Sequence, residues 1–393
     1  MKTGNLLIIT GSYPNEDNSY IGGIFIKDQI KELKHFFNHI YVISPTAIGI
    51  NLLRKTEISD YSYDNISVHF PKYINCPIFW YFGRKFWVHL EGRAVNSLLI
   101  KLDIKFDIIH AHFTWPSGAT SVKIKQKYNK PLIITEHSSI TFNKAIKNAD
   151  SIFINAWGNA NHIIRIRAGD VGLFERVGIE PNKISSIPNG YDDNFFHKMD
   201  MYECRTKLIL PDDKKIIINV GNFYSDVKGH KHLIDAISFL TKNRQDVLCI
   251  IVGSGSLGKN LEEQVRSLGL TDYIKFVGAK NHDEIPFWIN ACDLFVLPSL
   301  NEGNPTVMFE ALGCGKPFIG TRVGGVPEVI TSDDYGLLVE PANPEDLAEK
   351  ILIALDRKWD EKKILDHAAQ YTWENVAIQI MNVYEQVLKE TPQ

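Results

Sequence analysis

The sequence predicts a doubly wound α/β protein built from two Rossmann-like domains. Short, almost purely aliphatic runs alternate with amphipathic stretches along the 393 residues, and such runs are typical of parallel strands covered by helices on both faces. The alternation starts again near the middle, and the chain is too long for one ordinary core. The contents of 44% apolar and 23% charged residues are those of a globular protein.

The expected elements follow from the apolar pattern. Strands are expected at residues 6–10, 40–44, 66–70, 108–110, 132–135 and 151–154, and then at 216–220, 248–252, 274–277, 294–297, 318–320 and 336–339. Helices are expected at residues 27–36, 231–242, 261–268 and 304–312. The tail forms a further helix, because Val376, Ile380, Val383 and Val387 recur on one face, with Thr372 as N-cap.

The domain boundary is expected near residue 192. Residues 185–195 combine Pro, Asn, Gly and Asp, which is typical of turns and linkers, and a new strand follows at residue 216. The prediction is therefore a first domain at 1–192, a second at 193–370 and a C-terminal helix at 371–393. Ligands of such sheets bind beyond the carboxyl ends of the strands, so the site is expected in a cleft between the two domains.

Composition excludes several classes of protein. The net charge of -3 argues against a general nucleic-acid binder, which carries a basic excess. The five cysteines lack CxxC spacing, so neither a zinc site nor a disulfide framework is expected. The N-terminal sequence is typical of a first strand rather than a signal peptide, and no apolar run approaches the roughly 20 residues of a membrane span. A cytoplasmic protein is expected.

The most informative stretch is LPSLNEGNPTVMFEALGCGKP, residues 297–317. A helix beginning near Asn304, with Pro305 in its first turn, has unpaired N–H groups and a dipole that suit a diphosphate. Glu302 and Glu310 flank this seat, and a carboxylate can accept hydrogen bonds from the paired hydroxyls of a sugar or a ribose. The pattern therefore suits a nucleotide sugar. The alternative is an ordinary strand–loop–helix connection with two solvated glutamates.

Residues 297–328 resemble the Glu-x7-Glu region of the retaining GT-B glycosyltransferases of family 4. Other landmarks occur in matching order: Gly22–Gly23, DIIHAHFTWPSG, ITEHSS, IPNGYDDNFF, VGNFYSDVKGH, IVGSGSLGKNLEEQV and VGGVPEV. The resemblance implies two domains facing a central cleft, with an acceptor side in the first, the nucleotide sugar in the second, and a C-terminal helix that crosses back to the first. It implies transfer of a hexosyl unit, with retention, from a UDP- or GDP-linked sugar to a glycan or lipid-linked acceptor. Cell-surface polysaccharide or glycolipid assembly is the expected setting, with no cofactor and no bound metal.

The resemblance also assigns roles to residues. It implies catalytic roles for His137, Lys228 and Glu302, with Lys228 neutralising the leaving diphosphate. Relatives usually carry an arginine where this chain has Asn222. His110 and His112 are expected to point to opposite faces of their strand, so that one packs and His112 faces the site. The implied donor-binding residues are Gly22, Gly23, His112, Asn222, Gly278, Gly303, Asn304, Pro305, Thr306, Val307 and Glu310.

The sequence leaves several alternatives open. His137 could be a satisfied core histidine, and Gly22–Gly23 could be an ordinary turn. Residues 77–93, from Pro77 to Arg93, mix aromatic and basic side chains, which suits either peripheral membrane contact or a helix that buries its aromatic rings. The rival functions are an epimerase or a phosphorylase of the same fold, or a non-catalytic sugar-nucleotide-binding subunit. An NAD enzyme is disfavoured because GxGxxG is absent.

Overall fold

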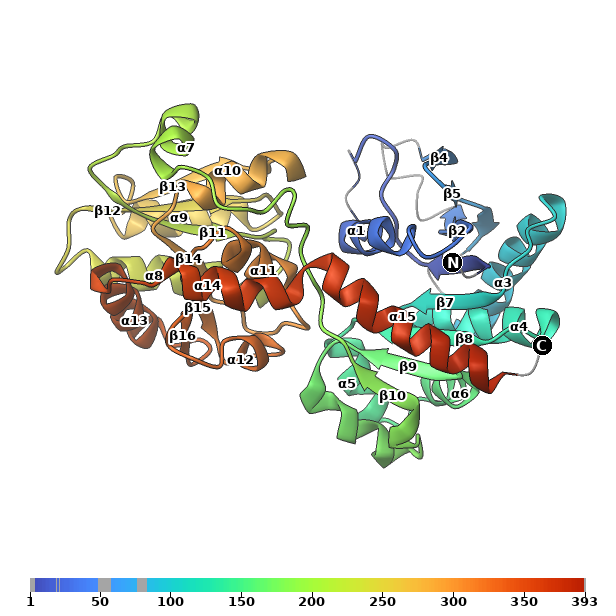
Figure 1. The fold of residues 1–393 in the computed structure, drawn as a ribbon. Coiled ribbons are helices and arrows are strands. Elements are labelled where there is room, and N and C mark those ends of the chain that lie inside the picture. Colours follow the sequence, from blue (N-terminus) through green and yellow to red (C-terminus); the bar gives the residue numbers. More distant parts are fainter. Residues whose placement is uncertain (1–3, 19, 21, 49–57, 76–82, 392–393) are drawn as a thin grey trace. The chain divides into compact units, whose positions relative to one another are not determined.

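The structure is a computed structural model that describes residues 4–18, 20, 22–48, 58–75 and 83–391. Two compact units divide the chain (Figure 1): unit 1 comprises residues 1–188 and 373–393, and unit 2 comprises residues 189–372. The division lies four residues before the expected boundary at 192, and the C-terminal helix belongs to unit 1.

Unit 1 is built on an eight-stranded sheet of order β10-β9-β8-β7-β1-β2-β5-β4, in which only the β4–β5 pair is antiparallel. A separate parallel pair joins β3 and β6. The strands are β1 (Asn5–Thr10), β2 (His39–Ile43), β3 (Thr46–Ile48), β4 (Tyr61–Tyr63), β5 (Ile66–His69), β6 (Lys72–Ile74), β7 (Ile108–His112), β8 (Leu132–Glu136), β9 (His162–Arg165) and β10 (Ile184–Ser186).

Helices cover both faces of this sheet. Alternate residues of β1 therefore enter different cores: Leu6 and Ile8 join one cluster, while Leu7 and Ile9 join the other. The helices and short helical turns are α1 (Ile24–Leu33), α3 (Arg84–Lys101), η2 (Thr114–Gly118), α4 (Ala119–Tyr128), α5 (Ile140–Lys147), α6 (Ser151–Asn159), η3 (Ala168–Val177), η4 (Pro181–Lys183) and α15 (Trp373–Glu390).

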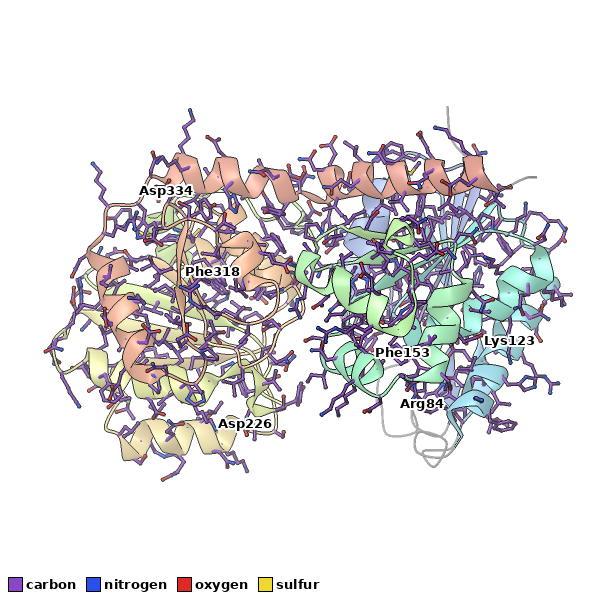
Figure 2. The ribbon with its side chains drawn as sticks, turned by 90° about the horizontal axis from the view of Figure 1, so that it is seen from below. Arg84, Lys123, Phe153, Asp226, Phe318 and Asp334 are labelled. Atoms are coloured by element: carbon purple, nitrogen blue, oxygen red, sulfur yellow. The ribbon has the colours of Figure 1, made fainter. Side chains whose placement is uncertain are left out.

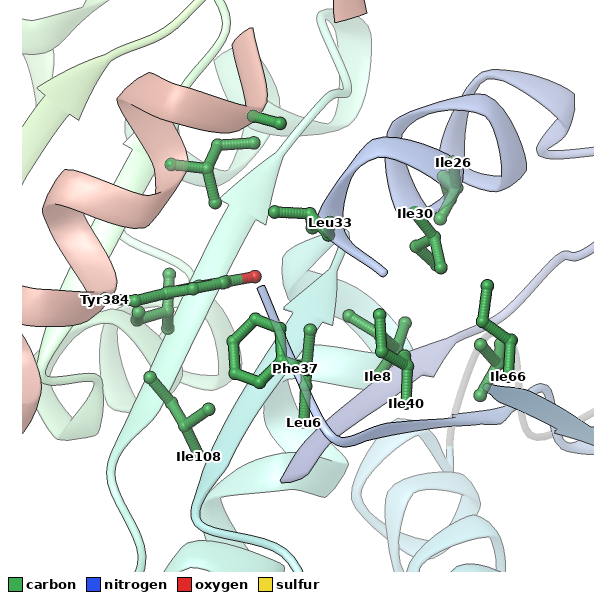
Figure 3. Packing of buried hydrophobic residues seen from close by; sticks show 14 of the residues in the cluster. Leu6, Ile8, Ile26, Ile30, Leu33, Phe37, Ile40, Ile66, Ile108 and Tyr384 are labelled. Carbon is green, nitrogen blue, oxygen red and sulfur yellow. The ribbon is translucent and has the colours of Figure 1, made fainter. Parts of the chain in front are cut away.

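Helix α15 completes the core of unit 1, although it lies far away in the sequence. Its buried face includes Val376, Ile380, Val383 and Val387, the positions that the sequence places together. Tyr384 lies on the same side, and its ring meets that of Phe37 edge-on at 5.7 Å (Figure 3). The helix begins directly after Thr372, in agreement with the expected position.

Unit 2 has a fully parallel six-stranded sheet of order β13-β12-β11-β14-β15-β16. The strands are β11 (Lys215–Val220), β12 (Val247–Val252), β13 (Ile274–Gly278), β14 (Leu294–Leu297), β15 (Phe318–Thr321) and β16 (Gly336–Val339). The helices and turns are α7 (Met201–Leu208), η5 (Asp226–Lys228), α8 (His230–Leu240), α9 (Gly258–Ser267), η6 (His282–Glu284), α10 (Ile285–Asn290), α11 (Thr306–Gly313), α12 (Val326–Val329), α13 (Pro344–Asp356), α14 (Glu361–Ala368) and η7 (Ala369–Tyr371). Two cores again lie on either side, so Ile216 and Ile217 enter different clusters.

The predicted fold class is confirmed, and one expected strand is wrong. Residues 151–154 form the first turn of α6 because the Asp150 carboxylate caps that helix and accepts from the N–H groups of Ile152 and Phe153. The sheet is continued instead by β9 and β10, which the apolar pattern missed because their short runs carry polar residues.

Candidate functional site

An ion pair joins two of the predicted site residues in unit 2. Lys228 ends the turn after β11, and Glu302 lies in the loop after β14, so both stand beyond the carboxyl ends of neighbouring strands. The Lys228 Nζ donates to Glu302 Oε1 at 2.8 Å, and Ser299 Oγ donates to the same oxygen at 2.6 Å. The Glu302 side chain is 8% exposed and that of Lys228 is 27% exposed, so water has access mainly from the lysine side.

Glycines hold the two loops that carry this pair. At Gly229, where φ is +67°, an added Cβ would stand 1.9 Å from the carbonyl oxygen of Pro298. At Gly324, where φ is +59°, it would stand 2.2 Å from the carbonyl oxygen of Glu302. The Leu300 N–H also donates to the Val227 carbonyl at 2.7 Å. The position of the ion pair therefore depends on backbone approaches that only glycine permits.

Helix α11 begins at Thr306, two residues later than expected. Pro305 has extended backbone angles and occupies the N-cap position rather than the first turn. Asn304 is buried, and it is fixed by Asn189: the Asn189 N–H donates to Asn304 Oδ1 at 2.8 Å, and Asn189 Nδ2 donates to the Asn304 carbonyl at 2.7 Å. Val307 and Thr306 are half-buried, and the N–H groups at the start of a helix have no carbonyl in a preceding turn.

The other predicted positions of unit 2 surround these loops or lie along α11. Gly303 accepts from the Gly325 N–H at 2.7 Å. Glu310 lies in α11 and is half-buried, and Asn222 is exposed in the loop after β11. Gly278 ends β13 with a φ of +76°, and an added Cβ there would meet nothing within 4 Å.

Two residues at this site were not singled out from the sequence. Ser299 donates to the Glu302 carboxylate, and its place directly after a buried strand is the signal that could have identified it. His230 opens α8 next to the Gly229 turn, where burial and then the nearby Lys228 charge lower its pKa to about 4. A neutral imidazole beside a lysine keeps the cationic charge of this turn on Lys228.

Histidines form the candidate cluster of unit 1. His112 Nδ1 lies 2.9 Å from His137 Nε2, and the His137 ring is packed against Phe25 and Phe113. Burial first, and then His110 and His137, lower the pKa of His112 well below its ordinary value. Its ring is therefore neutral at physiological pH, and its Nε2 has no hydrogen-bond partner among the described residues.

The expectation that His110 and His112 face different ways is wrong. Their rings stack at 4.4 Å because residues two apart on a strand share one face. His110 is the structural member of the pair: it meets Tyr384 Oη and Thr135 Oγ1, each at 2.6 Å. Burial lowers its pKa to about 3.

The glycine pair near the first strand forms a tight turn. Gly23 precedes α1 with a φ of +77°, and an added Cβ would stand 2.4 Å from the Ser12 carbonyl oxygen. At Gly22 a Cβ would meet Tyr20 Oη at 2.3 Å and Ser12 Oγ at 2.5 Å. The backbone contact therefore requires a glycine at position 23, whereas a side chain at position 22 would have to displace Tyr20 and Ser12. Contact of either glycine with a donor stays a prediction.

The aromatic and basic segment at 77–93 lies only partly within the described residues. Residues 77–82 fall outside them, and the remainder forms the start of α3. There Trp87 is buried and its Nε1 donates to Tyr73 Oη at 2.8 Å, whereas Phe86 is 48% exposed. Arg84 pairs with Asp150 at 2.5 Å.

The described parts of the chain also bear on membrane spans and metal sites. None of the helices described there has the length and apolar character of a membrane span. No group of three or more His, Cys, Asp or Glu side chains within these ranges is arranged to hold a metal ion. Whether the chemistry needs a metal stays a prediction.

Comparison with known proteins identifies the family. Residues 26–195 match the model of "Glycosyltransferase Family 4", and residues 200–371 match that of "Glycosyl transferases group 1". An uncharacterized glycosyltransferase of Methanocaldococcus jannaschii is 28% identical over 97% of this chain and 99% of its own.

Solved structures share the fold. The sucrose-phosphate synthase of Thermosynechococcus elongatus superimposes with a TM-score of 0.81 at 21% identity, over 99% of this chain and 100% of its own. Anabaena HepE, solved in complex with UDP, gives a TM-score of 0.74 at 20% identity, over 98% and 100% of the two chains. The chain therefore belongs to the family 4, group 1 glycosyltransferases and has their GT-B fold of two Rossmann-like domains.

Proposed function

We propose that this glycosyltransferase moves a hexosyl unit from a UDP- or GDP-linked sugar to a glycan or lipid-linked acceptor, with retention of configuration. Cell-surface polysaccharide or glycolipid assembly is the proposed setting. The Anabaena relative in fold was solved with UDP, which supports a nucleotide donor here. The proposal includes catalysis without a bound metal, so the charge of the leaving group must be met by protein groups.

The observation that carries the proposal is the Lys228–Glu302 pair in the loops that precede α8 and α11. The cation follows β11, while the carboxylate and the helix start both follow β14, at the same edge of the unit 2 sheet. A diphosphate takes a cation and helix N–H groups, while a sugar ring takes a carboxylate. Both Lys228 and Ser299 contact Oε1 of Glu302, and a carboxylate has further acceptor sites for sugar hydroxyls.

The remaining donor contacts are assigned by the same chemistry. Glu310 binds the ribose, and Gly278 lies beside the base, where the exposed backbone reads its edge. The diphosphate lies against the residues that lead into α11, namely Gly303, Asn304, Pro305, Thr306 and Val307. Asn222 supplies hydrogen bonds without charge, so Lys228 bears most of the leaving-group stabilisation in unit 2.

In the proposed reaction an acceptor hydroxyl attacks the anomeric carbon on the side from which the nucleotide leaves. The new carbon–oxygen bond forms as the bond between the anomeric carbon and the phosphate oxygen breaks, and the hydroxyl proton passes to that phosphate. Lys228 and the α11 N–H groups stabilise the charge that develops on the diphosphate. Holding both substrates in register supplies much of the remaining rate enhancement.

Unit 1 supplies the acceptor side in this proposal. His137 touches the donor sugar or the reacting centre, supported from behind by the neutral His112. The Gly22–Gly23 turn brings backbone close to the donor phosphates. The neutral His112 ring can donate or accept a hydrogen bond without adding a charge that competes with Lys228 for the diphosphate.

The proposed location is the cytoplasm, with peripheral contact at the inner face of the membrane. Support comes from α3, where Phe86 is 48% exposed beside Lys85 and one turn before His89, an arrangement that suits an anionic lipid surface. Co-sedimentation with phosphatidylglycerol vesicles should fall for Phe86→Ala. Equal sedimentation of variant and parent would remove the membrane part of the proposal.

The test is to screen UDP, GDP and ADP, and then their hexose conjugates, by thermal shift on the full chain. A bound nucleotide at 100 times its Kd stabilises the folded state by about 2.7 kcal/mol. Transfer is then assayed with the donor that binds, and the anomeric configuration of the product is read by NMR. Lys228→Ala should lower kcat by about 100-fold or more, whereas Lys275→Ala, an exposed lysine on β13, should not.

Other outcomes would contradict the proposal in different ways. Epimerised donor in the absence of acceptor would indicate an epimerase, and phosphate-dependent release of sugar would indicate a phosphorylase. Nucleotide binding without transfer to any acceptor would indicate a non-catalytic subunit. Wild-type turnover in Glu302→Ala would show that this carboxylate does not hold the sugar.

A further inference from the structure

A cavity with mixed polar and aromatic walls lies entirely within unit 1, at the carboxyl ends of β7 and β8. Its volume is about 420 Å³, within the range of small-molecule sites. The walls come from the loop after β7, from β8 and α5, and from the starts of α3 and α6. Open α/β sheets bind ligands at this edge, so the position of the cavity itself favours a substrate.

The carboxylates in this cavity are already compensated by the protein. Glu136 Oε1 accepts from the N–H and the hydroxyl of Ser138 at 2.7 and 2.5 Å, and Oε2 accepts from the Thr114 N–H at 3.1 Å. Asp150 caps α6 and also pairs with Arg84. Both carboxylates therefore have donors within the protein, and Arg84, Lys144 and Thr141 add further donors to the lining of the cavity.

These donors are two cations and a hydroxyl, and they come from α3 and α5. Arg84 is 28% exposed, and one of its five N–H groups is assigned to Asp150. Its guanidinium lies over the rings of Trp115 at 5.1 Å and Phe153 at 5.8 Å, and Figure 2 labels Arg84 and Phe153. Lys144 and Thr141 line the cavity from α5 and are exposed. An arginine fork with a lysine is the pattern that binds phosphate.

Phe113 links this cavity to the histidine cluster. It lines the cavity, and its ring lies 5.0 Å from that of His137. Its backbone has a φ of +68°, which is rare for an aromatic residue. The Phe113 N–H donates to the Thr135 carbonyl at 2.8 Å, and its own carbonyl accepts from the Gly118 N–H at 3.0 Å. Hydrogen bonds on both sides therefore hold this conformation at the cavity wall.

We propose that the cavity binds a phosphate group carried by the acceptor, so that the acceptor is a phosphorylated sugar or polyol. Arg84 and Lys144 hold the phosphate, the aromatic wall packs against the carbon skeleton, and the hydroxyl to be glycosylated faces His137. This inference rests on the proposed transferase activity. The acceptor is then selected in unit 1, whereas the donor is selected in unit 2.

The test is a calorimetric titration of the full chain with glucose 6-phosphate and with glucose, in the presence of saturating UDP to occupy the donor site. Glucose 6-phosphate should bind and glucose should bind at least tenfold more weakly, because a charge-assisted contact is lost. Lys144→Ala should raise the Kd for glucose 6-phosphate about tenfold, and Lys144→Glu should raise it further. Lys147→Ala is the matched control on α5, since that lysine is exposed outside the cavity, and it should change the Kd less than twofold.

A lipid headgroup is the other source of the same chemistry. Vesicles of phosphatidylcholine with phosphatidylglycerol form the second arm, and binding there that depends on Lys144, without binding of glucose 6-phosphate, would place the phosphate on a lipid. Equal Kd values for Lys144→Ala and Lys147→Ala in both arms would overturn the inference. UDP affinity is recorded in the same samples: loss of phosphate binding with UDP binding retained removes only this inference, whereas absence of UDP binding removes the proposed donor.

Discussion

The two candidate clusters meet the cost of buried polar groups in opposite ways. In unit 1, His110 and His112 are fully buried and neutral, because burial lowers the pKa of each ring. In unit 2, Glu302 is nearly as buried but remains paired with Lys228 at 2.8 Å. One cluster avoids charge, and the other keeps two opposite charges in contact.

The difference indicates which change should destabilise each unit most. Neutral buried histidines make the fold less stable at low pH, because protonation would place a positive charge where no water can solvate it. A buried ion pair is sensitive to the loss of either partner, since removal of one leaves the other uncompensated. The ion pair also depends on two loops held by glycines, so unit 2 should respond most to changes in its backbone.

The largest expected effect is that of Gly229→Ala in unit 2. The new methyl group would stand 1.9 Å from the Pro298 carbonyl oxygen, so the turn that carries Lys228 must move. We expect the free energy of unfolding to fall by about 3 kcal/mol, with increased hydrogen exchange in β11, α8 and β14. Urea unfolding combined with peptide-level hydrogen exchange would measure both.

Gly269→Ala provides the matched control. Gly269 has nearly the same φ, +68° against +67°, but an added Cβ there meets nothing within 4 Å. It should cost only the conformational term, about 1 kcal/mol. Equal losses in the two variants would mean that the close approach at Gly229 does not constrain the loop.

In unit 1 the largest effect is expected from Glu91→Gln, which changes a buried carboxyl group on α3. Burial raises the pKa of Glu91 to about 7 from a usual value of 4.5, so the folded state holds a proton that the unfolded chain releases. The stability contributed by that proton is present below pH 4.5 and is lost as pH rises to about 7, a loss of about 3 kcal/mol. Glutamine does not titrate. Between pH 4.5 and pH 8 the free energy of unfolding of the variant, relative to that of the parent, should therefore rise by that amount. A difference independent of pH would show that Glu91 is ionised in the folded state or solvated.

A smaller effect is expected from the ion pair itself. Lys228→Met leaves the Glu302 carboxylate with Ser299 as its recorded donor, and Glu302→Gln leaves the lysine without its counter-charge. Because Lys228 is 27% exposed, we expect a coupling free energy of about 2 kcal/mol, between the values for surface and fully buried pairs. A double-mutant cycle from urea unfolding isolates this coupling. Additive effects would show that the pair contributes nothing to stability beyond its separate members.

The sequence was a good guide where one physical rule acts alone. Aliphatic runs such as 216–220 and 294–297 became strands because a short run of this kind suits a parallel strand that helices cover on both faces. The face of α15 also followed from its period. Residues 151–154 misled because their composition is apolar, while the Asp150 cap decides the element. A helix cap and an apolar pattern can favour different secondary structures for the same residues. A run of four residues is too short to show which of the two prevails.

The site was predictable in its members but not in its contacts. Glu302 and Lys228 were singled out separately, and nothing in their spacing of 74 positions indicates that they pair. The role of Asn189 in fixing Asn304 depends likewise on tertiary packing across 115 positions. The stacking of His110 on His112 could have been foreseen, since residues two apart on a strand share a face.

The smallest expected effect concerns the acid sensitivity of the histidine cluster. His112 is kept neutral in the folded state because its pKa lies well below the ordinary 6.5, whereas the unfolded chain takes up a proton below pH 6.5. Its contribution to stability is therefore complete above pH 6.5 and declines as pH falls, by about 1.4 kcal/mol per pH unit. His112→Asn keeps a polar group of similar reach towards His137 and removes this titration. Because the unfolded histidine is only half protonated at pH 6.5, the variant should lose about 1 kcal/mol less than the parent between pH 6.5 and 5.5. Urea unfolding at both pH values measures the difference, and Glu91→Gln is the internal check because its pH dependence has the opposite sign. Parallel losses in parent and His112→Asn would mean that His112 is protonated in the folded state, and the contrast between a neutral cluster in unit 1 and a charged one in unit 2 would then fail.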